Sequence, residues 1–418
     1  MTGEGPAELH PMKTDQQQHV DALRGASKLA VAATLGVTEL VQELHRTIAS
    51  GPVVLGQPLA GPAKALTDWV YGAIRGVTGL VGTGLDGALS TLAPLLGSSA
   101  PGPQREALLA VLNGVLGDYL AATGNPLAIP MELRVGGRAL PLERAALRKA
   151  LPRATGKLLV LLHGSSMNDL QWERNGHDHG AALAKALGFT AVYLRYNSGL
   201  HVSTNGREFA AQLEKLASVW PVPLKEIVLL GHSMGGLVAR SACHVGARTR
   251  WRKKLRALVT LGTPHHGSPL ERGGNLIDLL LGVSVYSAPF ARLGQIRSAG
   301  VTDLRYGYVL DQDWEGRDRF AYVRDHRSSC PLPRGVDCYA VAGTTARTGK
   351  RRLPGDGLVP VDSALGHHRD PRRRLRFPES HRAIIHGASH LDLLDSPEVY
   401  AHLQRALSGR ERVARSAG

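Results

Sequence analysis

Short apolar runs alternate with segments of helical spacing from about residue 126 onward. Two strand-like stretches flank Gly136 and Gly137, and a two-residue glycine loop is typical of a β-hairpin. Further apolar runs of strand length lie at 157–162, 190–195, 226–230, 257–261 and 338–341. Helical segments such as 143–151 and 207–220 separate them. Repeated strand and helix units after a hairpin predict an α/β fold, with a mostly parallel twisted sheet and helices on both faces.

The first third of the chain has a different pattern. Residues 1–18 are polar and predict a disordered N-terminus. Residues 19–125 predict an N-terminal helical region, which either packs on the following domain or lies on a membrane surface. Three of its segments show apolar residues at helical steps: 20–48, 65–98 and 104–120. The α/β domain then spans 126–410.

The composition is that of a soluble globular protein, because 43% of the 418 residues are hydrophobic and 20% are charged. The net charge of +15 comes largely from arginine, with a cluster at 347–376. The positive electrostatic field of such a cluster can attract nucleic acid, anionic membranes or acidic substrates. No zinc-ligand spacing or RNA-binding aromatic signature accompanies the cluster. We therefore expect a solvated, arginine-rich surface and no nucleic-acid partner.

Three cysteines do not form a disulfide framework. Cys330 and Cys338 could pair across their loop in an oxidising compartment, and the sequence leaves this open. The N-terminus lacks the basic and apolar regions of a secretory signal. The weakly polar stretch 76–97 is interrupted by Asp86 and by glycines, which makes it a poor membrane span. We expect a cytoplasmic protein, with peripheral membrane contact through the N-terminal helices as an open alternative.

The sequence EIVLLGHSMGG at 226–236 combines a buried strand, a tight turn and the start of a helix. Gly231 and Gly235 stand two residues before and after Ser233. At these positions the strand and helix backbones approach so closely that a Cβ would clash. The turn holds the Ser233 hydroxyl at the carboxyl edge of the sheet, beside a helix N-terminus that favours negative charge. Ser233 is therefore predicted to attack an acyl carbon.

A serine nucleophile needs a base within hydrogen-bond reach and a third group that orients the base. In a parallel sheet, such groups lie at the carboxyl ends of later strands. Asp356 follows a late strand between two glycines, and His390 precedes a helix-like run. The order Ser233, Asp356, His390 is the one expected for a nucleophile on a strand-to-helix turn.

Several nearby residues compete for these roles. Asp362 is the alternative acid, although it is not flanked by glycines directly after a strand. His386 is the alternative base, and we expect it to end the last strand instead. His265 and His266 follow a strand on the same side and could line the pocket or hold their loop together. Cys243, on the helix behind the nucleophile, is expected in the core.

With these residues in place, the chain resembles the α/β-hydrolase superfamily. Within it, the chain resembles bacterial lipases and esterases and the GPI-inositol-deacylase-like hydrolases. The resemblance covers about residues 128–408 and leaves the first third outside the core fold. Five motifs carry it: LLHGSS (161–166), GHSMGG (231–236), LGTPHHGSP (261–269), GDGLVPVDS (355–363) and SHLDLL (389–394).

The resemblance implies Ser233 as the nucleophile, Asp356 as the orienting acid and His390 as the general base and acid. It further implies that the backbone N–H groups of Met234 and Ser165 form the oxyanion hole. No cofactor is implied.

The resemblance also bears on metal binding and on a cap. Asp392 occupies the position of a carboxylate that binds calcium in some similar lipases. No second calcium ligand accompanies it, so we expect a structural role and no metal. The insertion at about 266–335 is expected to form a cap, in which the apolar run 276–285 could cover the site or pack against the sheet.

These features predict a serine hydrolase that cleaves carboxylic esters through an acyl-enzyme on Ser233, with an ester or lipid-like small molecule as substrate. Thioesterases and amidases use the same machinery, and the sequence does not separate them. A different class remains as the alternative, a catalytically silent hydrolase fold that acts as a membrane-associated binding or scaffold protein.

Overall fold

The computed structural model describes residues 103–122, 124–268, 298–319, 325–348 and 353–408. Within this part, the residues from 107 to 122 and from 128 onward belong to one compact unit. The predictions for the first 102 residues, and for the apolar run 276–285 of the cap, lie outside the described residues. None of the described helices has the length and hydropathy that a membrane span requires.

Eight strands of the described chain form one sheet in the order β2-β1-β4-β3-β5-β6-β7-β8. The pairs β2–β1 and β1–β4 are antiparallel, and all other neighbours are parallel. The sheet is therefore mostly parallel, as the strand and helix alternation predicts. The strands are β1 (Glu132–Val135), β2 (Arg138–Ala139), β3 (Lys157–Leu162), β4 (Thr190–Arg195), β5 (Glu226–His232), β6 (Leu255–Leu261), β7 (Asp337–Thr344) and β8 (Arg382–His386).

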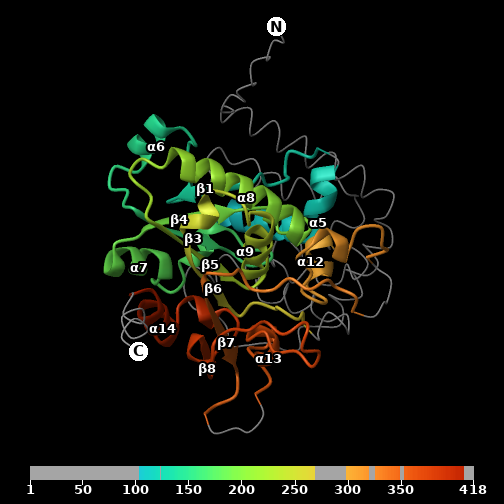
Figure 1. Cartoon of the computed structure of the whole chain (residues 1–418). Helices are drawn as coiled ribbons and strands as arrows, with labels where there is room; N and C mark the ends of the chain where they lie inside the picture. Colours follow the sequence, from blue (N-terminus) through green and yellow to red (C-terminus); the bar gives the residue numbers. More distant parts are fainter. Residues whose placement is uncertain (1–102, 123, 269–297, 320–324, 349–352, 409–418) are drawn as a thin grey trace, which may run out of the picture. The chain divides into compact units, whose positions relative to one another are not determined.

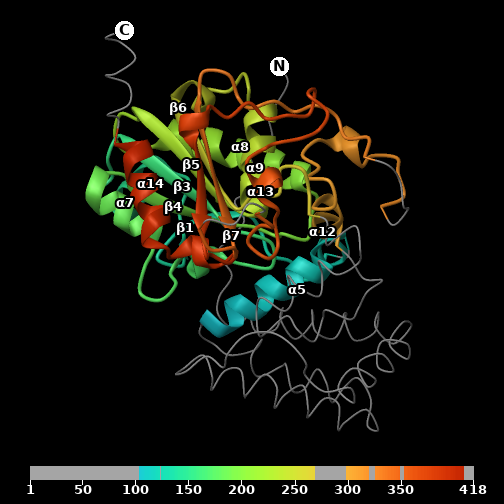
Figure 2. The same cartoon turned by 90° about the horizontal axis from the view of Figure 1, so that it is seen from below.

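Both faces of the sheet are buried. Successive side chains of the central strands point to opposite faces, so these strands contribute to two hydrophobic clusters, one on each face. In β3, Leu158 and Val160 join one hydrophobic cluster, whereas Leu159 and Leu161 join the other. Helices α8 (Val202–Val219) and α9 (Met234–Val245) pack on the first face. Helices α7 (His179–Leu187) and α14 (Pro397–Leu407) pack on the second (Figures 1 and 2).

The hairpin between β1 and β2 is confirmed. Gly136 and Gly137 have φ angles of 55° and 71°, which is the left-handed region that the two-residue loop requires. The remaining α-helices of the described chain are short, apart from the first one. They are α5 (Pro103–Ala122), α6 (Arg144–Ala150), α12 (Ala299–Asp303) and α13 (Val361–Ala364).

Strand ends and one helix start differ from the sequence prediction. Strand β5 continues past the apolar run, because Gly231 and His232 still pair with Thr260 and Leu261 of β6. Helix α8 begins at Val202 rather than at residue 207. Its first turn contains Ser, Thr, Asn and Gly, which have weak helix propensity, so the periodicity underestimates its length.

Helix α5 agrees with the helix predicted at 104–120. The helical spacing of this segment predicts an apolar face made of Leu108, Leu112, Val115, Leu116 and Tyr119, and for Tyr119 this is wrong. Tyr119 is 40% exposed, whereas Leu112 and Leu120 are buried. The buried positions of α5 also include Asn113 and Gly114. An apolar stripe cannot reveal this, because small residues contribute little to it but allow close packing.

Replacing Leu229 tests the central core. Its side chain is fully buried in β5, so Leu229→Ala is expected to lower the free energy of unfolding by about 2–5 kcal/mol. The measurement is urea denaturation. As a control, Val245→Ala removes a 48% exposed side chain and should change the stability by no more than about 0.5 kcal/mol. Equal effects of the two variants would contradict this description of the core.

Candidate active site

Ser233 lies on a strained turn between β5 and α9. Its φ of 54° and ψ of −124° place a residue that is not glycine in a conformation of high energy. The Ser233 N–H donates a hydrogen bond of 2.8 Å to the Leu261 carbonyl at the end of β6. The turn is thus held by the neighbouring strand, and Met234 occupies the first position of α9, where N–H groups have no partner within the helix.

Gly231 has the role that the sequence predicts, whereas Gly235 makes its close approach to β3 rather than to β5. A Cβ on Gly231 would lie 2.5 Å from the backbone nitrogen of Gly236. A Cβ on Gly235 would lie 2.2 Å from the carbonyl oxygen of Leu162 in β3. Real Cβ atoms do not approach backbone atoms this closely, so both positions exclude any larger residue.

Asp356 and His390 form a buried pair. The Nδ1 atom of His390 lies 2.7 Å from Oδ2 of Asp356, and the His390 N–H donates to the Asp356 carbonyl at 2.9 Å. The second carboxylate oxygen accepts hydrogen bonds from the N–H groups of Leu358 and Val359, at 2.9 and 2.7 Å. Asp356 and His390 are 3% and 4% exposed, so the carboxylate is fixed by the backbone and aimed at the imidazole.

The competing residues lie elsewhere. The side chain of Asp362 is 84% exposed and lies 3.2 Å from His367. His386 ends β8, as the sequence predicts, and pairs with Thr344 of β7 in the sheet. The structure thus brings His390 together with Asp356 and not with Asp362.

Ser233 and His390 line the same cavity, which has a volume of about 240 Å³. The Nε2 atom of His390 is buried and has no hydrogen-bond partner among the described residues. Ser165 lines the cavity next to Gly164, whose Cβ, if it had one, would lie 3.1 Å from the Ser233 Cβ. The other lining residues are Ser166, Met167, Gln171, Glu173, Arg174, His232, Leu358, Leu391 and Leu394.

Two residues beside the pair have no role in the sequence prediction. The Nε2 atom of His232 lies 3.1 Å from the His390 carbonyl oxygen, and the two rings are 4.7 Å apart. Gly262, with φ of 55°, leaves room for the pair, because a Cβ there would lie 3.0 Å from His390 Cε1 and 3.1 Å from Asp356 Oδ2. Both residues belong to motifs of the sequence, but only the fold shows what they contact.

His265 and His266 do not line this cavity. His265 is buried, with Nδ1 at 3.2 Å from the Arg240 guanidinium and Nε2 at 3.3 Å from the Thr260 hydroxyl. The His266 N–H donates to the Ser363 hydroxyl at 3.0 Å. Of the two roles that the sequence leaves open for these histidines, the contacts favour holding their loop together.

Asp392 and the three cysteines were the remaining candidates for a metal ligand or a disulfide. One carboxylate oxygen of Asp392 accepts hydrogen bonds from the N–H and the hydroxyl of Ser389, at 2.8 and 2.6 Å. No group of three potential metal ligands occurs in the described part of the chain. Cys243, Cys330 and Cys338 are buried free thiols, so the last two do not pair.

The fold and this arrangement define the class: the chain has the α/β-hydrolase fold, as the motifs predict. Residues 154–330 match the family model described as the PGAP1-like alpha/beta domain, which confirms the resemblance inferred from the sequence. The matched segment includes Ser233 but not Asp356 or His390.

The solved structures that are similar to the chain include two lipases and a phospholipase. Mature lipase BlEst2 of Bacillus licheniformis is 17% identical, with 67% of this chain and 98% of that chain covered and a TM-score of 0.40. Lipase B of Aspergillus fumigatus is 14% identical, with 87% and 83% covered and a TM-score of 0.40. Phospholipase PlaB of Legionella pneumophila is 15% identical, with 50% and 45% covered and a TM-score of 0.36. Similarity of this degree says nothing about activity. No curated protein sequence matches the chain.

The buried histidines make stability depend on pH. Burial lowers the pKa of His163 and His266 to about 3 and that of His179 to about 4, and it holds the pKa values of His232 and His265 well below 6.5. The unfolded chain takes up these protons near pH 6.5, so it binds more protons than the folded chain below that pH. Stability should therefore fall as the pH drops from about 6.5 toward 4, by about 1.4 kcal/mol per pH unit for each histidine.

Urea denaturation between about pH 7.5 and pH 4.5 measures this slope. His179→Gln keeps a donor for the Leu393 carbonyl, which lies 3.0 Å from Nε2, and should reduce the slope by one histidine's share. A stability that does not change over this range would contradict the prediction.

Proposed function

We propose that this protein is a serine hydrolase that cleaves carboxylic esters through an acyl-enzyme on Ser233. The observation that carries the proposal is that Ser233, on its strained turn, and His390, which is paired with Asp356, line one cavity. Nucleophile, base and orienting acid are the three parts that acyl transfer to a serine requires. The match to the PGAP1-like alpha/beta domain supports the same class of reaction.

In the proposed reaction, Nε2 of His390 removes the Ser233 hydroxyl proton while Oγ forms a bond to the ester carbonyl carbon. The N–H groups of Met234 and Ser165 stabilise the oxyanion that develops. The bond to the alcohol oxygen then breaks, and the alcohol leaves with the proton from His390. His390 then deprotonates a water molecule, whose oxygen attacks the acyl carbon. The bond to Oγ breaks, Oγ takes the proton back from His390, and the acid leaves.

Asp356 supports this proton transfer in two ways. By accepting from Nδ1 of His390, it keeps Nε2 free as the acceptor and favours the charged imidazolium that forms. Its own position is set by the N–H groups of Leu358 and Val359. Nε2 of His390 has no hydrogen bond to Ser233 within the described part of the chain, and such bonds often form only when substrate binds.

The substrate is proposed to be an ester or lipid-like small molecule. Met167, Leu358, Leu391 and Leu394 give the cavity apolar walls. Gln171, Glu173 and Arg174 give it a polar side. Its volume of about 240 Å³ is smaller than the roughly 300–1,000 Å³ of typical ligand sites. We therefore expect a preference for short acyl chains in a series of chromogenic esters, with thioesters and amides tested in parallel.

Ser233→Ala tests the nucleophile. Loss of the attacking oxygen should lower kcat for a chromogenic ester by about 10⁶-fold and abolish covalent labelling by a fluorophosphonate probe. Ser218→Ala, which removes an exposed hydroxyl on α8, is the control and should be labelled like the wild type. Ester turnover that persists in the Ser233→Ala protein would refute the proposed function.

Asp356→Asn tests the orienting acid. The amide can donate to Nδ1 of His390 and so favour the wrong tautomer, which should lower kcat by about 10⁴-fold without loss of folding. Asp362→Asn is the matched control, because that carboxylate is exposed and lies beside His367, away from His390. Similar rates for the two variants, measured with the same ester, would show that Asp356 does not orient the base.

A further inference from the structure

The loop of residues 163–167, which we call the His-Gly loop, contains a second strained residue. Ser166 has a φ of 58° and is buried, directly after Ser165, whose N–H is proposed to bind the oxyanion. A residue that is not glycine keeps this conformation only when its surroundings impose it. The contacts around Ser166 therefore hold the chain in place directly after Ser165.

One of these contacts comes from a loop after β4. The Ser166 N–H donates to the Ser198 hydroxyl at 3.0 Å. The same loop is tied to helix α5, because Nδ2 of Asn197 donates to the Gly117 carbonyl at 2.8 Å. A Cβ on Gly117 would lie 1.8 Å from the Asn197 side-chain oxygen, so the two segments are in direct contact.

The tightest packing against Ser166 comes from α5 itself. A Cβ on Gly114 would lie 2.0 Å from the Ser166 hydroxyl oxygen and 2.9 Å from the Ser166 backbone. Glycine in the interior of a helix lowers its stability relative to alanine, so helix propensity does not explain the glycine at position 114. What glycine provides is the space that Ser166 occupies.

Helix α5 is fixed in this position by α12. The Ser298 hydroxyl donates to the Gly114 carbonyl at 2.6 Å, and the Ala299 N–H donates to the Asp118 carboxylate at 3.0 Å. Helices α5 and α12 lie side by side in both views (Figures 1 and 2). The Gly300 N–H in turn donates to the Gly199 carbonyl at 3.0 Å, so α12 also holds the loop that carries Ser198.

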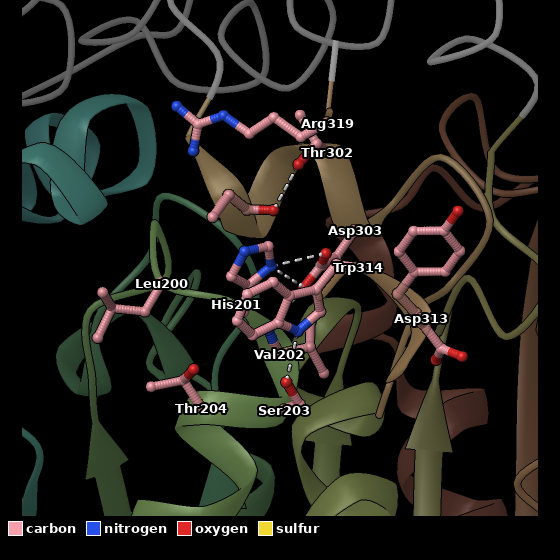
Figure 3. Close-up of polar contacts among 12 residues, drawn as sticks. Leu200, His201, Val202, Ser203, Thr204, Thr302, Asp303, Asp313, Trp314 and Arg319 are labelled. Atoms are coloured by element: carbon pink, nitrogen blue, oxygen red, sulfur yellow. Dashed lines mark hydrogen bonds and ion pairs between the residues drawn. The ribbon is translucent and has the colours of Figure 1, made fainter. Parts of the chain in front are cut away.

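The far end of that loop is held by a buried carboxylate (Figure 3). Asp303 lies 3.0 Å from Nδ1 of His201 and accepts from the Val202 N–H at 2.8 Å. Trp314 stacks on His201, with ring centroids 3.7 Å apart, and donates to the Ser203 hydroxyl. The loop at 197–201 is therefore clamped at both ends, and the Ser198 hydroxyl is a fixed acceptor for Ser166.

We propose that Gly114 is a positioning residue for the oxyanion hole. Its missing side chain lets α5 press directly on Ser166, and this packing holds the Ser165 N–H where the oxyanion develops. The inference rests on the proposed ester hydrolysis. Helix α5, which lies outside the segment that resembles known hydrolases, would then help to set the geometry of the reaction.

Gly114→Ala is the test. The added Cβ would displace Ser166 and with it the Ser165 N–H, so kcat for a chromogenic ester should fall by about 10²-fold with KM changed less than about threefold. Tm should fall by about 2 °C or more, although alanine is the better helix former. Ala121→Gly is the control, because it weakens α5 at an exposed position and should keep kcat within about threefold.

Ser166→Gly supplies the rescue. It removes the hydroxyl and Cβ that meet the new methyl group, and glycine adopts the positive φ without strain. The double variant Gly114→Ala/Ser166→Gly is expected to lie within about tenfold of Ser166→Gly alone in kcat, since the new methyl group then meets only the backbone of residue 166.

The possible outcomes separate the inference from the proposed function. Wild-type turnover combined with an unaffected Gly114→Ala variant would overturn this inference and leave the proposed function intact. The same holds if Gly114→Ala loses activity but Ser166→Gly brings no recovery, or if Ala121→Gly loses as much. A wild-type protein without ester turnover would instead remove the proposed function together with the inference.

Discussion

The close approach of β5 and α9 at Ser233 is the constraint on which the rest of the site depends. Gly231 lets the backbones of β5 and α9 approach to distances that no Cβ allows, and Gly235 does the same for α9 and the end of β3. The strained serine conformation persists because its N–H is held by the Leu261 carbonyl of β6. The turn is therefore locked into the sheet, and other groups of the site are placed relative to it.

The electrostatics of the site follow from burial. Asp356 is held by two backbone N–H groups and faces His390 across 2.7 Å, so a charged imidazole, as the proposed reaction requires, would have a fixed counter-charge. His163 and His232, both fully buried nearby, have lowered pKa values. Neutral imidazoles at these positions avoid repulsion with a charged His390.

The support for the site extends well beyond the strands that carry it. Helix α5, the loop at 197–201 and helix α12 are far apart in sequence, yet hydrogen bonds join them around Ser166. Glycines allow these contacts, because the segments meet backbone to side chain without intervening side chains. The result is a hydrogen-bonded frame around the His-Gly loop, which would suit the proposed oxyanion hole, because a small displacement of a donor costs much of its effect.

Much of the fold was predictable from the sequence alone. Strand order along the chain, the glycine hairpin and the turn at Ser233 all depend on local patterns, namely apolar runs and the absence of Cβ atoms. Where the local pattern was weak, the prediction of helix bounds and buried faces was incomplete. The start of α8 was missed because its first turn has weak helix formers, and the buried face of α5 was incomplete because its packing uses glycine.

The tertiary structure decided which distant side chains meet. Asp356 and Asp362 lie in one short segment, and only the fold directs the first at His390 and the second to solvent. The same holds for His232 beside His390 and for Gly114 against Ser166, where no sequence period links the partners. Such contacts depend on how strands and helices pack against each other. Residues that are far apart along the chain meet in this packing, and their positions in the sequence do not show it.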